Sequence, residues 1–205
     1  MADIFLSYRR HDSQSATGRL SDRLATHFGP ARVFLDHESI AAGDDFAEAI
    51  RRAVGTSVVL LAIVGPDWLT ACDANGKRRL DDEGDFVRLE IESALLGGVP
   101  VIPVLVEGAV MPTAAVLPPT LARFARCQAT ELSDTRWNYD VDRLIATLQA
   151  RFAIESEQAV PGSSGAGDGR INVLARLALD LLVLTAHPTR LIARQQTGHA
   201  LDHVR

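Results

Sequence analysis

An unbroken apolar run from Val58 to Val64 is the feature that most constrains the fold of this chain. Such a run is typical of a strand buried on both faces, as in a parallel sheet that helices cover on each side. Two further apolar runs, Ile4 to Leu6 and Val101 to Val106, alternate with segments of helical spacing. This alternation indicates βαβ units, so the N-terminal part is predicted to be an α/β domain around a mostly parallel sheet.

The remaining elements follow from periodicity and from capping residues. We expect helices at Ser15–Phe28, Phe46–Val54, Phe86–Leu96 and Tyr139–Phe152, and further strands at Arg32–Leu35 and Gln128–Glu131. Asp85 is the expected N-cap of the third helix. Pro103 removes a backbone donor from its strand, which favours a position near a sheet edge or a local irregularity. The segment from Gly65 to Asp85 carries turn residues and a charged middle, and is predicted to be a loop.

Composition excludes several classes of function. The 205 residues contain 21 Lys and Arg against 26 Asp and Glu, a net charge of −5, which argues against nucleic acid as a partner. The two cysteines, Cys72 and Cys127, form neither a disulfide framework nor a zinc-binding spacing, so we expect a reducing, cytoplasmic location. The six histidines form no ligand pair, and we expect no metal site. The sequence also lacks the common phosphate-loop, serine-hydrolase and metalloprotease motifs.

The composition changes after Phe152. Residues 153–170 are rich in Gly and Ser and are predicted to be a flexible linker between a domain at 1–152 and a C-terminal segment at 171–205. Ile171 to Ala186 is an apolar helix candidate with charges at Arg176 and Asp180, shorter than the ~20 apolar residues of a membrane span. A packing helix is favoured over membrane association, and both interpretations stay open. The chain ends without an obvious terminator, which is compatible with a longer parent protein.

Three polar clusters follow predicted strands, at the sheet edge where α/β proteins bind ligands. Tyr8, Arg9 and Arg10 offer an aromatic ring and two guanidinium groups that suit a diphosphate, with a solvent-exposed basic turn as the alternative. The loop Asp36 to Asp44 is either functional or simply an acidic surface loop.

The third cluster lies on the helix that Asp85 is expected to cap. Phe86 and Glu90 are four positions apart and share a helix face, although Glu90 on its own is most simply an exposed glutamate. Arg88 and Glu92 have the same spacing and are expected to form a solvent-exposed pair.

Taken together, these segments resemble a bacterial TIR (Toll/interleukin-1 receptor) domain of the NAD+-cleaving type. The similarity covers about residues 1–150 and is carried by Asp3–Arg10, Val33–Asp36, Gly43–Phe46, Val64–Leu69, Phe86–Leu95 and Val101–Val106. The resemblance implies a flavodoxin-like, three-layer fold with a five-stranded, mostly parallel sheet. It also identifies Asp36 to Asp44 as the BB loop of the family, through which subunits contact one another.

The resemblance further implies cleavage of the bond between nicotinamide and ribose, by a glycohydrolase or cyclase in antiphage defence. Glu90 matches the catalytic glutamate of the family pattern W-x-x-x-E, with Phe in place of Trp at position 86. The implied substrate-binding residues are Tyr8, Arg9, Arg10, Gly43, Phe46 and Phe86. A glutamate that some members carry two positions before the loop glycine is Ala41 here. NAD+ is the implied substrate, and no further cofactor is expected.

One carboxylate is chemically sufficient for this reaction. Nicotinamide leaves as a neutral molecule, and positive oxocarbenium charge develops on the ribose. A carboxylate held near the ribose hydroxyls can stabilise that charge, most effectively where water is excluded. The alternative is a non-catalytic TIR module that signals by homotypic contact. A nucleoside-deoxyribosyltransferase-like enzyme is a third possibility, against which the BB-loop pattern argues. For Ile171 to Ala186 we expect self-association, a partner domain or a membrane contact.

Overall fold

The apolar run becomes β3 (Val59–Val64), which is buried along its whole length at the centre of a five-stranded sheet. The computed structural model describes residues 3–35 and 46–158. The strand order is β2-β1-β3-β4-β5 and every pairing is parallel, which confirms the predicted α/β class. The other strands are β1 (Ile4–Ser7), β2 (Val33–Phe34), β4 (Val101–Val106) and β5 (Thr130–Leu132).

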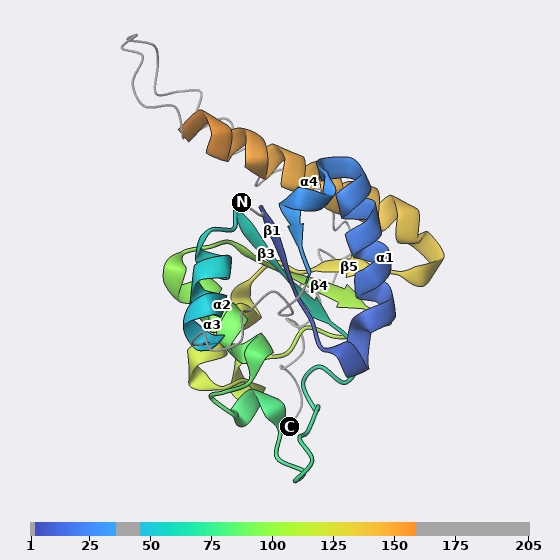
Figure 1. The fold of residues 1–205 in the computed structure, drawn as a ribbon. Coiled ribbons are helices and arrows are strands. Elements are labelled where there is room, and N and C mark those ends of the chain that lie inside the picture. The colour runs from blue at the N-terminus through green and yellow to red at the C-terminus, as the bar shows by residue number, and fades with distance from the viewer. Residues whose placement is uncertain (1–2, 36–45, 159–205) are drawn as a thin grey trace, which may run out of the picture. The chain divides into compact units, whose positions relative to one another are not determined.

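Helices cover both faces of the sheet and give it three layers (Figure 1). The helices α1 (Arg10–Phe28) and α4 (Trp137–Gln158) lie on one face, and α2 (Phe46–Gly55) and α3 (Phe86–Gly97) lie on the other. Alternate side chains of β3 enter the two apolar cores: Val59, Leu61 and Ile63 pack on the side of α1 and α4, and Leu60, Ala62 and Val64 on the opposite side. Because both faces are covered, the strand reads as continuously apolar.

Pro103 lies where a missing backbone donor costs little. It pairs with Ala62 of β3 on one side, whereas β5 begins its pairing with β4 only at Val104. The strand is next to the edge of the sheet, as expected, and its proline has no β5 partner that would need an N–H group.

Two helices differ in length from the prediction. The helix α1 begins at Arg10 rather than Ser15, and its first turn is separated from the rest by a kink at Ser13 (φ −138°, ψ 21°), which periodicity does not reveal. The helix α4 continues to Gln158, past the expected boundary at Phe152. The BB loop, the rest of the linker and the predicted helix Ile171 to Ala186 lie outside the described residues. Within the described ranges, none of the helices has the length and apolarity that crossing a membrane requires.

Candidate functional site

The carboxyl ends of β1 and β3 are neighbours, since Ser7 pairs with Ala62. The residues that follow the two strands, together with the start of α3, surround a cavity of about 670 Å³. Tyr8, Arg10, Cys72 and Phe86 are among the residues that line it. A cavity at this edge agrees with the general position of ligand sites in open α/β sheets.

Arg9 and Asp85 form a buried ion pair beside this cavity. The two terminal nitrogens of Arg9 donate to the two carboxylate oxygens of Asp85 at 2.9 and 3.0 Å, and Arg9 Nε donates to the carbonyl of Trp68 at 3.2 Å. The side chains are only 3% and 1% exposed. Arg9 thus joins the segment after β1, the segment after β3 and the start of α3. This contact spans 76 residues of sequence.

Asp85 is the N-cap of α3, as the sequence predicted. Its side chain accepts the backbone N–H of Arg88 at 3.0 Å, and the residue has extended backbone angles (φ −68°, ψ 125°). The helix ends at Gly97 and is capped by Gly98, whose left-handed conformation (φ 73°) favours glycine. The same carboxylate therefore caps the helix and neutralises Arg9, so the start of α3 is fixed to the sheet edge.

Asp12 connects the first turn of α1 to the segment after β3. Its carboxylate oxygens accept the backbone N–H groups of Gly65 at 2.9 Å and Asp67 at 2.7 Å. Burial raises the pKa of Asp12 above its ordinary 3.8, although these two N–H groups act in the opposite direction. A Cβ at Gly65 would lie 2.5 Å from the carboxylate oxygens, so only glycine permits this approach.

The helix α3 places Phe86 and Glu90 on one face at two different depths. Phe86 lines the cavity and is 39% exposed, whereas the Glu90 side chain is 0% exposed. Glu90 follows one helical turn later, about 6 Å along the helix axis, and the described cavity wall extends on α3 only to Val87. The expectation of an exposed glutamate is wrong for Glu90, because the helix turns this face toward the protein interior.

The pair Arg88–Glu92 is present, but the prediction that it faces solvent is wrong. Arg88 Nε donates to Glu92 Oε1 at 2.6 Å, and the side chains are 10% and 17% exposed. Arg88 also donates to the carbonyl of Leu80, and Glu92 accepts from Thr120. Residues from two other segments therefore cover a helix face that spacing alone assigned to solvent.

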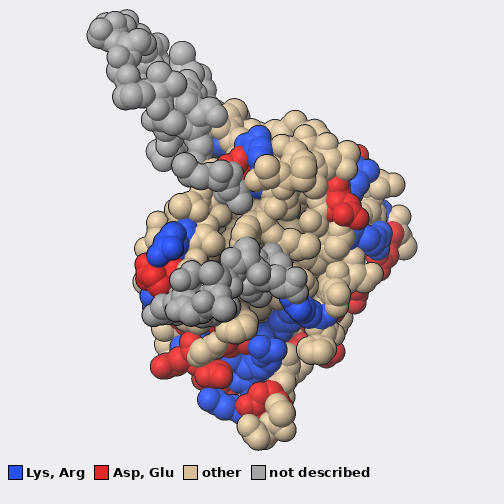
Figure 2. Space-filling model, viewed as in Figure 1, with Lys and Arg blue, Asp and Glu red and all other residues tan. Residues whose placement is uncertain are grey.

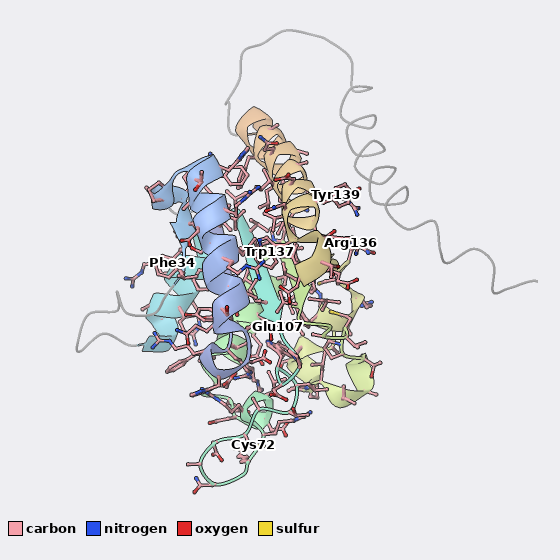
Figure 3. All side chains as sticks on the ribbon, turned by 90° about the vertical axis from the view of Figure 1, so that its right-hand side faces the viewer. Phe34, Cys72, Glu107, Arg136, Trp137 and Tyr139 are labelled. Carbon is pink, nitrogen blue, oxygen red and sulfur yellow. The ribbon has the colours of Figure 1, made fainter. Side chains whose placement is uncertain are left out.

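The loop before α3 is more ordered than its turn-rich sequence predicted. Cys72 and Arg78 form an antiparallel bridge, and Asp73 accepts the backbone N–H groups of Asn75 at 2.8 Å and Lys77 at 2.9 Å. These two bonds lower the pKa of Asp73. Figure 3 shows Cys72 in this projecting loop. The hairpin that this bridge closes, from Cys72 to Arg78, is followed by Arg79. Arg79 lines the cavity and donates from Nε to Asp85 Oδ2 at 3.1 Å.

A smaller cavity of about 350 Å³ adjoins the larger one on the side of the hairpin. The two share His11, Cys72, Arg79 and Phe86 in their walls. In Figure 2, Lys and Arg side chains gather together with Asp and Glu on the lower part of the face, over the loop that precedes α3. The combined site is therefore polar and mixed in charge. Among the described residues, no three His, Cys, Asp or Glu side chains form a group that could hold a metal ion.

Comparison with known proteins decides the family. The model of the TIR domain family matches residues 4–145. The chain belongs to the TIR domain family. Among solved structures, it is similar to the TIR domains of the activated Roq1 resistosome directly recognising the pathogen effector XopQ, with a TM-score of 0.52 and 14% identity over 72% of this chain and 99% of that one. No curated protein matches the chain. At this identity the structural likeness shows the TIR fold alone.

The structure brings together four of the predicted site residues of this TIR domain. Tyr8, Arg9, Arg10 and Phe86 all line the larger cavity. Tyr8 is half-buried against the core, and Arg10 is exposed. The alternative of a solvent-exposed basic turn does not hold for Arg9, because this residue is buried and Asp85 engages both of its terminal nitrogens. Its role toward a substrate stays a prediction, as does that of Glu90.

Two predicted residues cannot be placed at the site. Gly43 lies outside the described residues, and Phe46 begins α2 without a described side chain. Sequence reasoning missed Arg79 and Asp12, which the fold brings to the cavity wall. Neither carries a local motif. Arg79 belongs to a charged loop, and the partner of Asp12 is a backbone segment 53 residues away.

Proposed function

We propose that this TIR domain cleaves NAD+ between nicotinamide and ribose, as a glycohydrolase or cyclase. The observation that carries the proposal is the position of Glu90: a fully buried carboxylate, one turn along the same helix face from an aromatic residue at a cavity wall. Burial of a carboxylate is unfavourable unless the surroundings compensate it, and such groups concentrate at functional sites.

The chemistry follows from the charge that develops on the substrate. As the glycosidic bond breaks, its electron pair leaves with nicotinamide, which becomes neutral, and the ribose acquires oxocarbenium character. The Glu90 carboxylate stabilises this positive charge, and its exclusion from water strengthens the interaction. Phe86 offers a ring for stacking at the cavity wall, with less area than a tryptophan and no N–H donor. The anomeric carbon is then attacked either by water, which gives the linear product, or by a nucleophile within the substrate, which gives a cyclic product.

Self-assembly is the second part of the proposal. The BB loop, Asp36 to Asp44, is the expected contact between subunits, and the structural neighbour is described as an activated resistosome. Assembly in a TIR signalling system fits a role in defence against phage by consuming NAD+. We place the protein in the cytoplasm, with Ile171 to Ala186 as a contact to a partner domain, to further copies or to a membrane surface.

The test is nicotinamide release from NAD+ by the full chain at low and high protein concentration. We expect release, with a specific activity that rises as concentration favours assembly. NADH is the matched control. The positive charge on the nicotinamide of NAD+ makes this ring a good leaving group, and the dihydronicotinamide of NADH lacks that charge, so NADH should stay intact. Absence of nicotinamide at every concentration would contradict the proposal and favour a non-catalytic module acting through TIR–TIR contact.

A further inference from the structure

We propose that Arg79 binds the diphosphate of the dinucleotide at the junction of the two cavities, an inference that rests on the proposed function. Arg79 lines both the larger and the smaller cavity, so a ligand that occupies both passes this residue. Its side chain is 39% exposed, which leaves it accessible from the site. No sequence motif marks it.

Charge at the Asp85 cluster favours an anion. Asp85 accepts two bonds from Arg9, one from Arg79 and one from the Arg88 backbone N–H, which uses the acceptor capacity of its two oxygens. The guanidinium groups of Arg9 and Arg79 share the single carboxylate of Asp85, so this group of three side chains carries one net positive charge. The buried Arg9 takes the bidentate position. The uncompensated charge therefore lies on the exposed side, at Arg79.

Arg79 is held in place while its outer donors face the site. Only Nε is bonded to Asp85, and within the described residues the two terminal nitrogens make no hydrogen bond. A guanidinium group with two adjacent donors matches two phosphate oxygens, and the bond to Asp85 removes part of the conformational freedom that binding would otherwise cost. The hairpin supports this position, because Arg79 N donates to the Ala71 carbonyl at 2.8 Å.

The other charged groups in the two walls are of both signs: Asp12, Asp67, Asp73 and Asp82 are acidic, and Arg10 and Lys77 are basic. The case for an anion at Arg79 therefore rests on its outer donors and not on the net charge of the walls. Asp12 is engaged by the Gly65 and Asp67 N–H groups, and Asp73 by those of Asn75 and Lys77. Lys77 lines the smaller cavity and Arg10 lines the larger one. Phosphates at Arg79 would leave one nucleoside in each cavity, and Phe86 lines both cavities.

The experiment compares Arg79→Gln with the neighbouring Arg78→Gln. Arg78 is a matched control, since it pairs with Asp81, donates to the Val116 carbonyl and lines neither cavity. Binding of ADP-ribose, which keeps the diphosphate but cannot react, is measured by calorimetry on the full chain. We expect Arg79→Gln to weaken binding roughly 10-fold, the effect of losing a partly exposed charged hydrogen bond, and Arg78→Gln to bind as the parent does. The KM for NAD+ should rise in Arg79→Gln while kcat is kept.

A second measurement needs no variant. Cys72 lines both cavities, so bound ADP-ribose should slow its alkylation by iodoacetamide. Parental ADP-ribose affinity in Arg79→Gln, or binding without protection of Cys72, would overturn the inference while nicotinamide release could still support the proposed function. Conversely, Arg79-dependent binding without any nicotinamide release would retain the diphosphate site and refute the enzyme.

Discussion

Replacing Asp85 by alanine is predicted to destabilise the domain strongly, because one carboxylate has two structural duties. The change leaves the guanidinium of Arg9, whose side chain is 3% exposed, with only the carbonyl of Trp68 as a described acceptor. It also removes the N-cap that accepts the Arg88 N–H. Breaking a buried ion pair on one side costs about 3–5 kcal/mol, and the lost cap adds roughly 1 kcal/mol.

A loss of this size is a large part of the stability of an ordinary domain. For a domain of about 150 residues, 1 kcal/mol corresponds to about 2–4 °C in Tm, so Asp85→Ala is expected to melt roughly 10–15 °C below the parent. Thermal unfolding followed by circular dichroism measures this. Asp81→Ala is the control, because it removes an aspartate of the same loop from an exposed pair with Arg78, and it should melt with the parent.

The double variant Arg9→Met with Asp85→Ala separates the two duties of the carboxylate. Removing Arg9 as well eliminates the stranded buried charge, so the double variant should recover part of the loss rather than add to it. A Tm for Asp85→Ala equal to that of Asp81→Ala, or strictly additive losses in the double variant, would refute the argument that Arg9 and Asp85 fix α3 to the sheet edge.

Three further predictions follow from the same segments. Gly65→Ala should lower the free energy of unfolding by about 1–2 kcal/mol in urea titrations, because its Cβ displaces the Asp12 carboxylate from its N–H donors; an unchanged midpoint would contradict this. Burial raises the folded-state pKa of Asp12, so its contribution to stability is full below pH 3.8 and declines as the pH rises through the raised value. Asp12→Asn should remove that decline from the free energy of unfolding measured against pH. A profile identical to that of the parent would contradict the prediction. Burial also raises the pKa of the Cys127 thiol, so at pH 8 iodoacetamide should label the exposed Cys72 first, as peptide mass spectrometry would show.

Much of the fold could be predicted from the sequence because its signals are local. The apolar run of β3 reports burial on two faces, and Asp85 and Gly98 mark the ends of α3. The family pattern likewise depends on short segments, and the family match over residues 4–145 supports it. These signals need no knowledge of which segments meet in space.

The parts that could not be predicted depend on distant contacts. Arg9 looks like a solvent-exposed cation until the fold brings it to Asp85, and Glu92 looks solvent-exposed until Thr120 packs over it. The burial of Glu90 has the same origin, since it depends on how α3 lies against its neighbours. Arg79 enters the site only because a hairpin in a turn-rich loop returns it to the cavity wall.

The central claim is that the Glu90 carboxylate stabilises the cation formed on the ribose, and Glu90→Gln tests it most directly. The substitution keeps shape and removes charge, with Glu92→Gln on the same helix as its control and thermal melting to verify folding. Nicotinamide release from NAD+ should fall about 10²–10³-fold in Glu90→Gln and stay at the parental rate in Glu92→Gln. A folded Glu90→Gln protein that releases nicotinamide as fast as the parent would contradict the account.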